Sequence, residues 1–408
     1  MRRPPELRLH LAVVLLNAGD GIAGTLAPLY FDQRGYPVEL IGVLVALYAV
    51  AGLLSRLPSG IVYRPRRAAR LMYAALALQV VATALYPVPA DAWLLGVVRA
   101  VHGFAVGMAT TVNMATFMDS LAADGNRHRH LAGYASALAV GYTIGGLAGG
   151  LLGYWLDYAG AFVCAAGFPL LAALCVTTPP PRATATERPA GPASLATRLA
   201  RLGAAVAHPQ VALVSLASFV LAVLHAFGQT FVPLYAANVG LNLAEIGLLR
   251  AAHSATNALA RPFCGELTGR FGYQRVTVVG MAVLAAVLAL TPWQTGLLGL
   301  TVLFVGVGLC RAAVLVANTV SVADVEEGAA SRGVTVAVYN AARDLGVIVG
   351  PVIGGFLAGA LGLRAFFWVG PPLVLALYGL LLWGLARGPR GLPTALPGEG
   401  PAPGRSRS

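Results

Sequence analysis

Residues 333–360 read GVTVAVYNAARDLGVIVGPVIGGFLAGA, and residues 130–157 read HLAGYASALAVGYTIGGLAGGLLGYWLD. Both stretches exceed the roughly 20 mostly apolar residues that a helix needs to cross a bilayer. Each carries glycines at positions i, i+4 and i+8, which line one helix face and let a neighbouring helix approach closely. The two stretches therefore predict membrane-spanning helices that pack tightly against partners.

The two stretches belong to an internal repeat. Four glycines of the first recur 205 residues later in the second: Gly141, Gly145, Gly149 and Gly150 match Gly346, Gly350, Gly354 and Gly355. The same offset aligns Pro28-Leu29-Tyr30 with Pro233-Leu234-Tyr235, and Asn113 with Asn318. A constant offset along the whole chain indicates two homologous halves.

Twelve segments are long and apolar enough to span a membrane: residues 9–30, 38–62, 71–88, 92–117, 130–157, 160–178, 210–235, 243–266, 275–293, 296–320, 333–360 and 364–386. Hydrophobic residues make up 58% of the chain and charged residues 11%, against about 25% charged in soluble domains. We therefore predict an all-α membrane protein with twelve transmembrane helices in two pseudo-symmetric six-helix halves.

The domain organisation follows from these segments. We expect an N-terminal half at residues 1–178, a cytoplasmic linker at 179–208 and a C-terminal half at 209–386. Leu195, Leu199 and Leu202 share one helix face, which predicts an interfacial helix in the linker. Residues 387–408 are rich in Pro and Gly and are expected to form a disordered cytoplasmic tail.

Basic residues gather in alternate loops, which places these loops and both termini on the cytoplasmic side. The arginines concerned are Arg64, Arg66, Arg67, Arg70, Arg127, Arg129, Arg182, Arg188, Arg198, Arg201, Arg270, Arg275, Arg332, Arg387, Arg390, Arg405 and Arg407. Six spans per half give the halves parallel topology, which puts a cavity between them near the membrane midplane. We expect a multi-pass monomer in a bacterial inner membrane.

Several motifs resemble the major facilitator superfamily over essentially the whole chain. The loop from Gly265 to Arg275, GELTGRFGYQR, is similar to the family's G-x-L-x-D-R-x-G-x-R loop, and residues 60–70 hold a more degraded copy. The element Gly350-Pro351-x-x-Gly354-Gly355 is similar to one that, in the fifth span, marks the antiporter branch; here the fifth span lacks the Pro.

The resemblance implies a transporter that works by rocking, with the loops latching helices during gating. The residues it assigns to gating or packing are Gly60, Arg64, Gly265, Arg270, Gly272, Gly145, Gly149, Gly350, Pro351 and Gly354. Plain helix packing is an equally compatible interpretation of the glycines.

Ionisable residues inside the membrane cost about 2.5–3.5 kcal/mol each, so each one suggests a function. Asp20, in the middle of the first span, is the first candidate for proton coupling; Asp344 and His225 are the others. His225 occupies the repeat position of Asp20. A structural salt bridge between Asp20 and Arg99 is the alternative. Arg343 and Asp344 are adjacent, so they are expected to point apart.

The candidates for lining a substrate cavity are mainly cationic: Arg99, His102, Gln229, Arg250, His253 and Arg311. Arginines outnumber acids inside the predicted spans, which leaves room for an anionic or zwitterionic solute. We expect the partners to be a small-molecule substrate, protons and the lipid bilayer.

The favoured function is proton-driven efflux of a small molecule. The alternatives are proton-coupled uptake of an anionic or zwitterionic metabolite and a non-transporting sensor on the same fold. The chain contains no Lys, so a nucleotide-driven pump with a G-x-x-x-x-G-K-[ST] loop is excluded. We find no catalytic motif. The charges lie in short loops, which argues against nucleic acid, and the cysteines lack metal-ligand spacing, so no metal or cofactor is expected.

Overall fold

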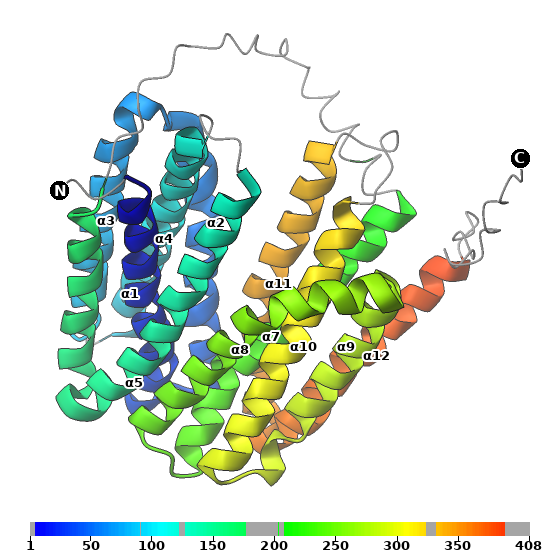
Figure 1. Ribbon diagram of the computed structural model, residues 1–408. Helices are drawn as coiled ribbons and strands as arrows, with labels where there is room; N and C mark the ends of the chain where they lie inside the picture. The colour runs from blue at the N-terminus through cyan, green and yellow to red at the C-terminus, as the bar shows by residue number, and fades with distance from the viewer. Residues whose placement is uncertain are drawn as a thin grey trace, which may run out of the picture.

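The computed structural model describes residues 5–89, 91–121, 127–176, 203, 208–323 and 332–387, and every regular element within them is helical (Figure 1). The α-helices are α1 (Pro5–Gln33), α2 (Val38–Val62), α3 (Ala68–Ala84), α4 (Ala92–Leu121), α5 (Arg127–Ala173), α7 (Pro209–Asn238), α8 (Leu243–Phe271), α9 (Tyr273–Ala289), α10 (Leu297–Ala323), α11 (Arg332–Leu361) and α12 (Leu363–Arg387). Two short 3₁₀ helices, η1 (Pro65–Arg67) and η2 (Thr291–Trp293), join them. The all-α prediction is confirmed.

Helix α5 consists of two arms that meet at Asp157. This residue has φ 58° and ψ 178°, which no helix accommodates, and the chain turns back there in Figure 1. Among the described residues, nine helices are long and apolar enough to cross a membrane, and the candidate span in α5 is 41 residues long, enough for two crossings. Helices α3 and α8 fall short of that standard, so twelve crossings stay a prediction.

The packing repeats itself before and after the linker. Helix α1 packs along α5 as α7 packs along α11, and α2 packs along α4 as α8 packs along α10. Glycines make these approaches possible: a Cβ added at Gly145 would lie 2.5 Å from the carbonyl oxygen of Ala18, and one at Gly346 would lie 2.5 Å from that of Phe219. The pairings relate helices 205 residues apart, as the sequence repeat predicts.

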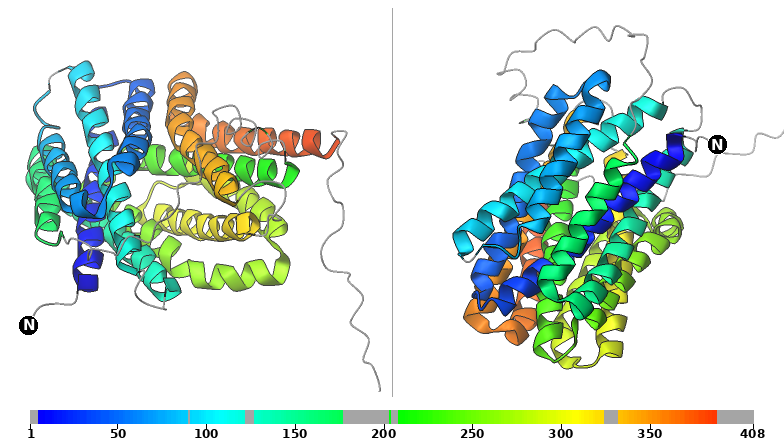
Figure 2. Two further views of the ribbon diagram at one scale, coloured as in Figure 1. Left: turned by 90° about the horizontal axis from the view of Figure 1, so that it is seen from above. Right: turned by 90° about the vertical axis from the view of Figure 1, so that its left-hand side faces the viewer.

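The two groups of helices, side by side in Figure 2, meet along two seams, α5 against α8 and α2 against α11. A Cβ at Gly150 would lie 2.5 Å from the Cα of Gly247, and one at Gly42 would lie 2.2 Å from the carbonyl oxygen of Pro351. Gly42 and Gly247 lie near the starts of α2 and α8, so these closest contacts gather at one end of the molecule, the lower end in Figure 1.

Two sequence predictions fall outside the described residues. The interfacial helix of the 179–208 linker lies among residues whose structure is not described, apart from Gly203 and His208, and so does the 387–408 tail beyond Arg387.

Candidate functional site

Asp20 is a buried carboxylate where α1, α2 and α5 converge. The hydroxyl of Tyr48 donates to its Oδ1 at 2.6 Å, and the hydroxyl of Tyr142 donates to its Oδ2 at 3.2 Å. Gly21 and Gly145 bring α1 and α5 close enough for the second bond, since a Cβ at Gly21 would lie 3.1 Å from the Cα of Gly145. Asp20 is 8% exposed, and Tyr142 beside it is 40% exposed.

Arg99 on α4 joins this cluster through an aromatic ring. Its guanidinium lies 4.6 Å from the centre of the Tyr48 ring and donates to the hydroxyl of Tyr86 at 2.9 Å. The Tyr86 oxygen also lies 3.0 Å from Nδ1 of His102, whose Nε2 is 4.0 Å from Oδ1 of Asp20. The structure has no ion pair between Asp20 and Arg99, so it does not support the alternative of a direct salt bridge; Tyr48 contacts both side chains instead.

The second side of the site carries two imidazoles. The rings of His225 on α7 and His253 on α8 stack with centroids 5.7 Å apart, and Nδ1 of His253 lies 3.3 Å from the carbonyl oxygen of Phe304. At the repeat offset of 205, His225 corresponds to Asp20 and His253 to Tyr48. The acid–phenol pair of one half is therefore a pair of imidazoles in the other.

The imidazoles lie beside two arginines without carboxylate partners. Arg250 donates to the carbonyl oxygen of Gln229 at 2.9 Å, and neither Arg250 nor Arg311 has an acidic group within 4.0 Å among the described residues. Three buried nitrogens lack hydrogen-bond partners in the same part of the chain: Nδ1 of His225, Nε2 of Gln229 and Nε2 of His253. This side of the site therefore carries positive charge and several buried nitrogens that lack a hydrogen-bond partner.

The two sides form one electrostatic region. Arg250 interacts electrostatically with Asp20, and Arg311 with Tyr142. A Cβ added at Gly146 of α5 would lie 3.1 Å from the Cβ of Arg250. This arginine therefore packs directly against α5. Asp20, Arg99 and His102 therefore form one cluster within the first group of helices, and Arg250 links it across the α5–α8 seam to the second group. The candidates in the second group are His225, Gln229, Arg250, His253 and Arg311.

Asp344, the remaining proton-coupling candidate, is engaged in ion pairs. Its Oδ2 bonds to the guanidinium of Arg56 on α2, and its Oδ1 lies 3.2 Å from that of Arg343. The expectation that Arg343 and Asp344 point apart was wrong, because the long arginine side chain folds back on its neighbour. The Arg56 bond ties α11 to α2 across a seam.

The family model of the Major Facilitator Superfamily matches residues 9–241 and 214–406. The chain belongs to the major facilitator superfamily. Multidrug resistance protein MdtG of Rahnella sp. (strain Y9602) is 31% identical over 156 residues, so the match spans 36% of each protein. The family membership makes the chain a multi-pass membrane transporter of small molecules, and not an enzyme.

Two solved structures share the fold of this superfamily member. A bacterial homologue of the human lysosomal transporter Spinster, in an inward-facing and unoccupied conformation, has a TM-score of 0.71 at 17% identity, covering 95% of this chain and 96% of that one. The nucleoside transporter NupG has a TM-score of 0.75 at 13% identity, covering 94% and 100%. These likenesses extend over nearly the full length and confirm the predicted fold.

The motif loops of this superfamily member make local contacts. Arg64 donates to the carbonyl oxygens of Ile61 and Tyr63, and Arg270 lies 5.5 Å from the ring centre of Phe271. A Cβ at Gly60 or Gly265 would meet nothing within 4 Å, and Gly272 ends α8 with φ 79°. No described contact of the two arginines reaches another transmembrane helix, so the latch role stays a prediction.

The intramembrane glycines of the transporter serve two kinds of contact. Gly145 and Gly149 face α1, while Gly350 and Gly354 face α7, all within one group of helices. Pro351, one residue further round α11 than Gly350, lies against Gly42 of α2. Packing within a group and contact across a seam therefore involve neighbouring faces of the same helix, about 100° apart.

Sequence reasoning missed Tyr86. It follows α3 near a predicted helix end, where a tyrosine carries no signal of a polar cluster, yet it is fully buried between Arg99 and His102. Only the folding of the chain after α3 back over α4 brings the three side chains together.

Proposed function

We propose that this transporter is a proton-coupled exporter that exchanges a small molecule for protons by alternating access, with Asp20 as the proton site. The observation that carries the proposal is the pair of tyrosine hydroxyls around the Asp20 carboxyl. A phenol hydroxyl can donate or accept a hydrogen bond. Tyr48 and Tyr142 can therefore donate to the ionised carboxylate, and either can accept from the protonated acid. Asp20 therefore gains or loses a proton without leaving a buried polar atom unpaired.

The seams support alternating access. Gly150 and Gly247 meet backbone to backbone, so no interlocked side chains must separate when the halves part there. The contacts gather at the end opposite the N-terminus in Figure 1. With both termini on the cytoplasmic side of the cell membrane, this arrangement corresponds to an inward-facing state, closed on the outside.

The test uses purified protein in liposomes with an imposed pH gradient and an internal pH-sensitive dye. A panel of drugs and organic acids is added one at a time. We expect at least one compound to trigger dissipation of the gradient, with solute and protons moving in opposite directions. Movement in the same direction would identify a symporter, solute flux without protons a uniporter, and binding without flux a sensor.

Proton-coupled uptake of an anionic or zwitterionic metabolite is the second candidate, and Arg250 and Arg311 favour its anionic substrate class. These two arginines and the buried, unpartnered nitrogens of His225, Gln229 and His253 gather hydrogen-bond donors, and among the described residues no carboxylate lies within 4.0 Å of either arginine. An arginine guanidinium can donate two parallel hydrogen bonds to a carboxylate or phosphate group, and these bonds are stronger in a site that excludes water.

Arg311→Gln tests the anionic substrate class of the second candidate. If the substrate is anionic, its apparent affinity falls about 10-fold or more, because a hydrogen bond to a charged group contributes about 1.5–3 kcal/mol. The matched control is Arg343→Gln, an arginine already engaged with Asp344 and partly exposed. Affinity is measured by competition with a labelled transported compound. Unchanged affinity in Arg311→Gln would remove the anionic class.

A further inference from the structure

A pocket between α7, α9, α10 and α12 has a polar lining that the proposed transport cycle does not use. It has an empty volume of about 760 Å³, part of it open to the surroundings. Gln210, Gln274, Thr277, Asn318 and Ser321 supply its polar groups, and no charged side chain lines it. The rest of the wall is apolar and aromatic. Such a lining suits a neutral group that accepts hydrogen bonds and carries an alkyl chain.

Two buried polar atoms of this lining have no partner. The hydroxyl of Thr277 donates to Oδ1 of Asn318 at 3.1 Å, which fixes the amide and leaves Nδ2 without an acceptor. The hydroxyl of Ser321 also lacks a hydrogen bond. Asn318 and Ser321 are 2% and 1% exposed. A buried donor left unpaired is costly, so a ligand that brings an acceptor is favoured here.

The polar groups lie close to the ends of α9 and α10. With a rise of 1.5 Å per residue, Thr277 is about 6 Å from the start of α9 at Tyr273, and Asn318 is about 7.5 Å from the end of α10 at Ala323. The headgroup regions make up roughly 10–15 Å of a bilayer that is about 40–45 Å thick. With these helix ends at the membrane surface, the polar groups would lie at the depth of the lipid ester groups. Exposed Val278 on α9 and Leu381 on α12 adjoin the pocket with apolar surface.

We propose that the pocket binds a phospholipid of the adjacent leaflet by its ester region, with Asn318 Nδ2 donating to an ester carbonyl and an acyl chain along the apolar wall. Exposed Arg275 follows Gln274 directly and stands at the rim, where a lipid phosphate would lie. Helices α7 and α10 also carry His225 and Arg311, so an occupant here contacts the same helices as the transport site.

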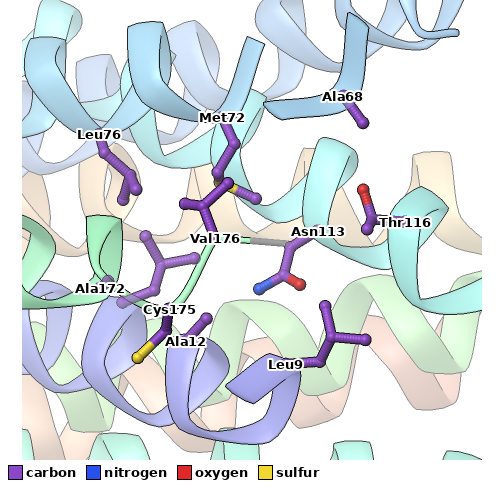
Figure 3. Close-up of a pocket in the computed structure, with 11 residues that line it drawn as sticks. Leu9, Ala12, Ala68, Met72, Leu76, Asn113, Thr116, Ala172, Cys175 and Val176 are labelled. Carbon is purple, nitrogen blue, oxygen red and sulfur yellow. The ribbon is translucent and has the colours of Figure 1, made fainter. Parts of the chain in front are cut away.

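The other half provides an internal comparison (Figure 3). Its counterpart pocket between α1, α3, α4 and α5 contains Ala12 where the first has Ala217, and Asn113 where it has Asn318. Met72 replaces Thr277, and the empty volume is about 370 Å³. The smaller, more apolar pocket lacks both the room and the hydroxyl that orients the amide.

The test titrates the delipidated full-length protein with two phosphatidylglycerols of equal chain length, one ester-linked and one ether-linked, and counts bound lipids by native mass spectrometry. We expect the ester lipid to bind about fivefold more tightly at one site, the effect of one hydrogen bond. Ala217→Leu fills the pocket and should abolish this site, whereas the matched Ala12→Leu should retain it.

Asn318→Leu adds an independent check, because it should bind both lipids equally. This comparison is made within one variant, so it holds even if Ala217→Leu fails to fold, which the melting temperature will reveal. Equal affinity of the wild type for the two lipids would overturn the proposal. Retention of the tight site in folded Ala217→Leu, or absence of any tight site in the wild type, would do the same.

Discussion

Asp20→Asn is expected to reduce substrate-triggered proton movement to the rate of empty liposomes while leaving the protein folded. The amide matches the carboxylate in shape, so its oxygen still accepts from Tyr48 and its nitrogen donates to the oxygen of Tyr142. What the variant lacks is a group that titrates. The measurement is dye-reported proton flux in liposomes of matched protein content, with the melting temperature as a check on folding.

The matched control for this variant is Asp32→Asn, the same change on the same helix at an exposed position. It should leave proton movement unchanged. If Asp20→Asn transports with full coupling, Asp20 is not the proton site. Substitutions at His225 and Asp344 would then test the two remaining candidates.

Substrate affinity provides a second readout of Asp20. In an exchanger, a proton on Asp20 and the substrate compete, and binding linkage is reciprocal. Apparent affinity in the wild type should therefore fall as the pH is lowered through the titration of Asp20. In Asp20→Asn this dependence should vanish. A rise in wild-type affinity on acidification would instead identify co-transport, because the proton would then favour binding.

The fold was predictable because one sequence offset recurs in the packing. The repeated glycines predicted how the halves correspond. In the structure Gly141, Gly145 and Gly149 contact α1 as Gly346, Gly350 and Gly354 contact α7, while Gly150 and Gly355 contact α8 and α2 across the seams. The sharp turn at Asp157 was predicted only as a gap between two spans. Its left-handed backbone depends on how the two arms of α5 pack, which apolar content does not encode.

The candidate site was predictable in its members but not in its connections. Charged residues are rare in apolar segments, and this predicted Asp20, Arg99, Arg250 and Arg311 as site residues. It did not predict which of these side chains contact one another. Tyr48 connects Asp20 to Arg99 only because its rotamer places the hydroxyl on Asp20 and the ring centre 4.6 Å from the Arg99 guanidinium. Likewise, the contact between adjacent Arg343 and Asp344 depends on side-chain bending that residue spacing does not reveal.

Gly150→Ala is expected to open the seam between α5 and α8. The added methyl would lie 2.4 Å from the carbonyl oxygen of Leu243 and 2.5 Å from the Cα of Gly247, and both neighbours are backbone atoms that cannot swing aside. Overpacking costs about 1–3 kcal/mol, which shifts a conformational equilibrium about 5–150-fold. Transport should fall by a similar factor, since the closed-seam state becomes rare.

Hydrogen–deuterium exchange of the Leu243–Arg250 segment reports the seam directly. In the wild type, we expect this segment to be protected by contact with α5; in Gly150→Ala, its exchange should rise while the core of α1 stays protected. Gly167→Ala is the matched control, because a Cβ there meets nothing within 4 Å on the same α5. A uniform rise in exchange together with a lower melting temperature would assign Gly150 to folding. Unchanged transport with unchanged exchange would mean that the seam tolerates the methyl group and that its glycines do not control access.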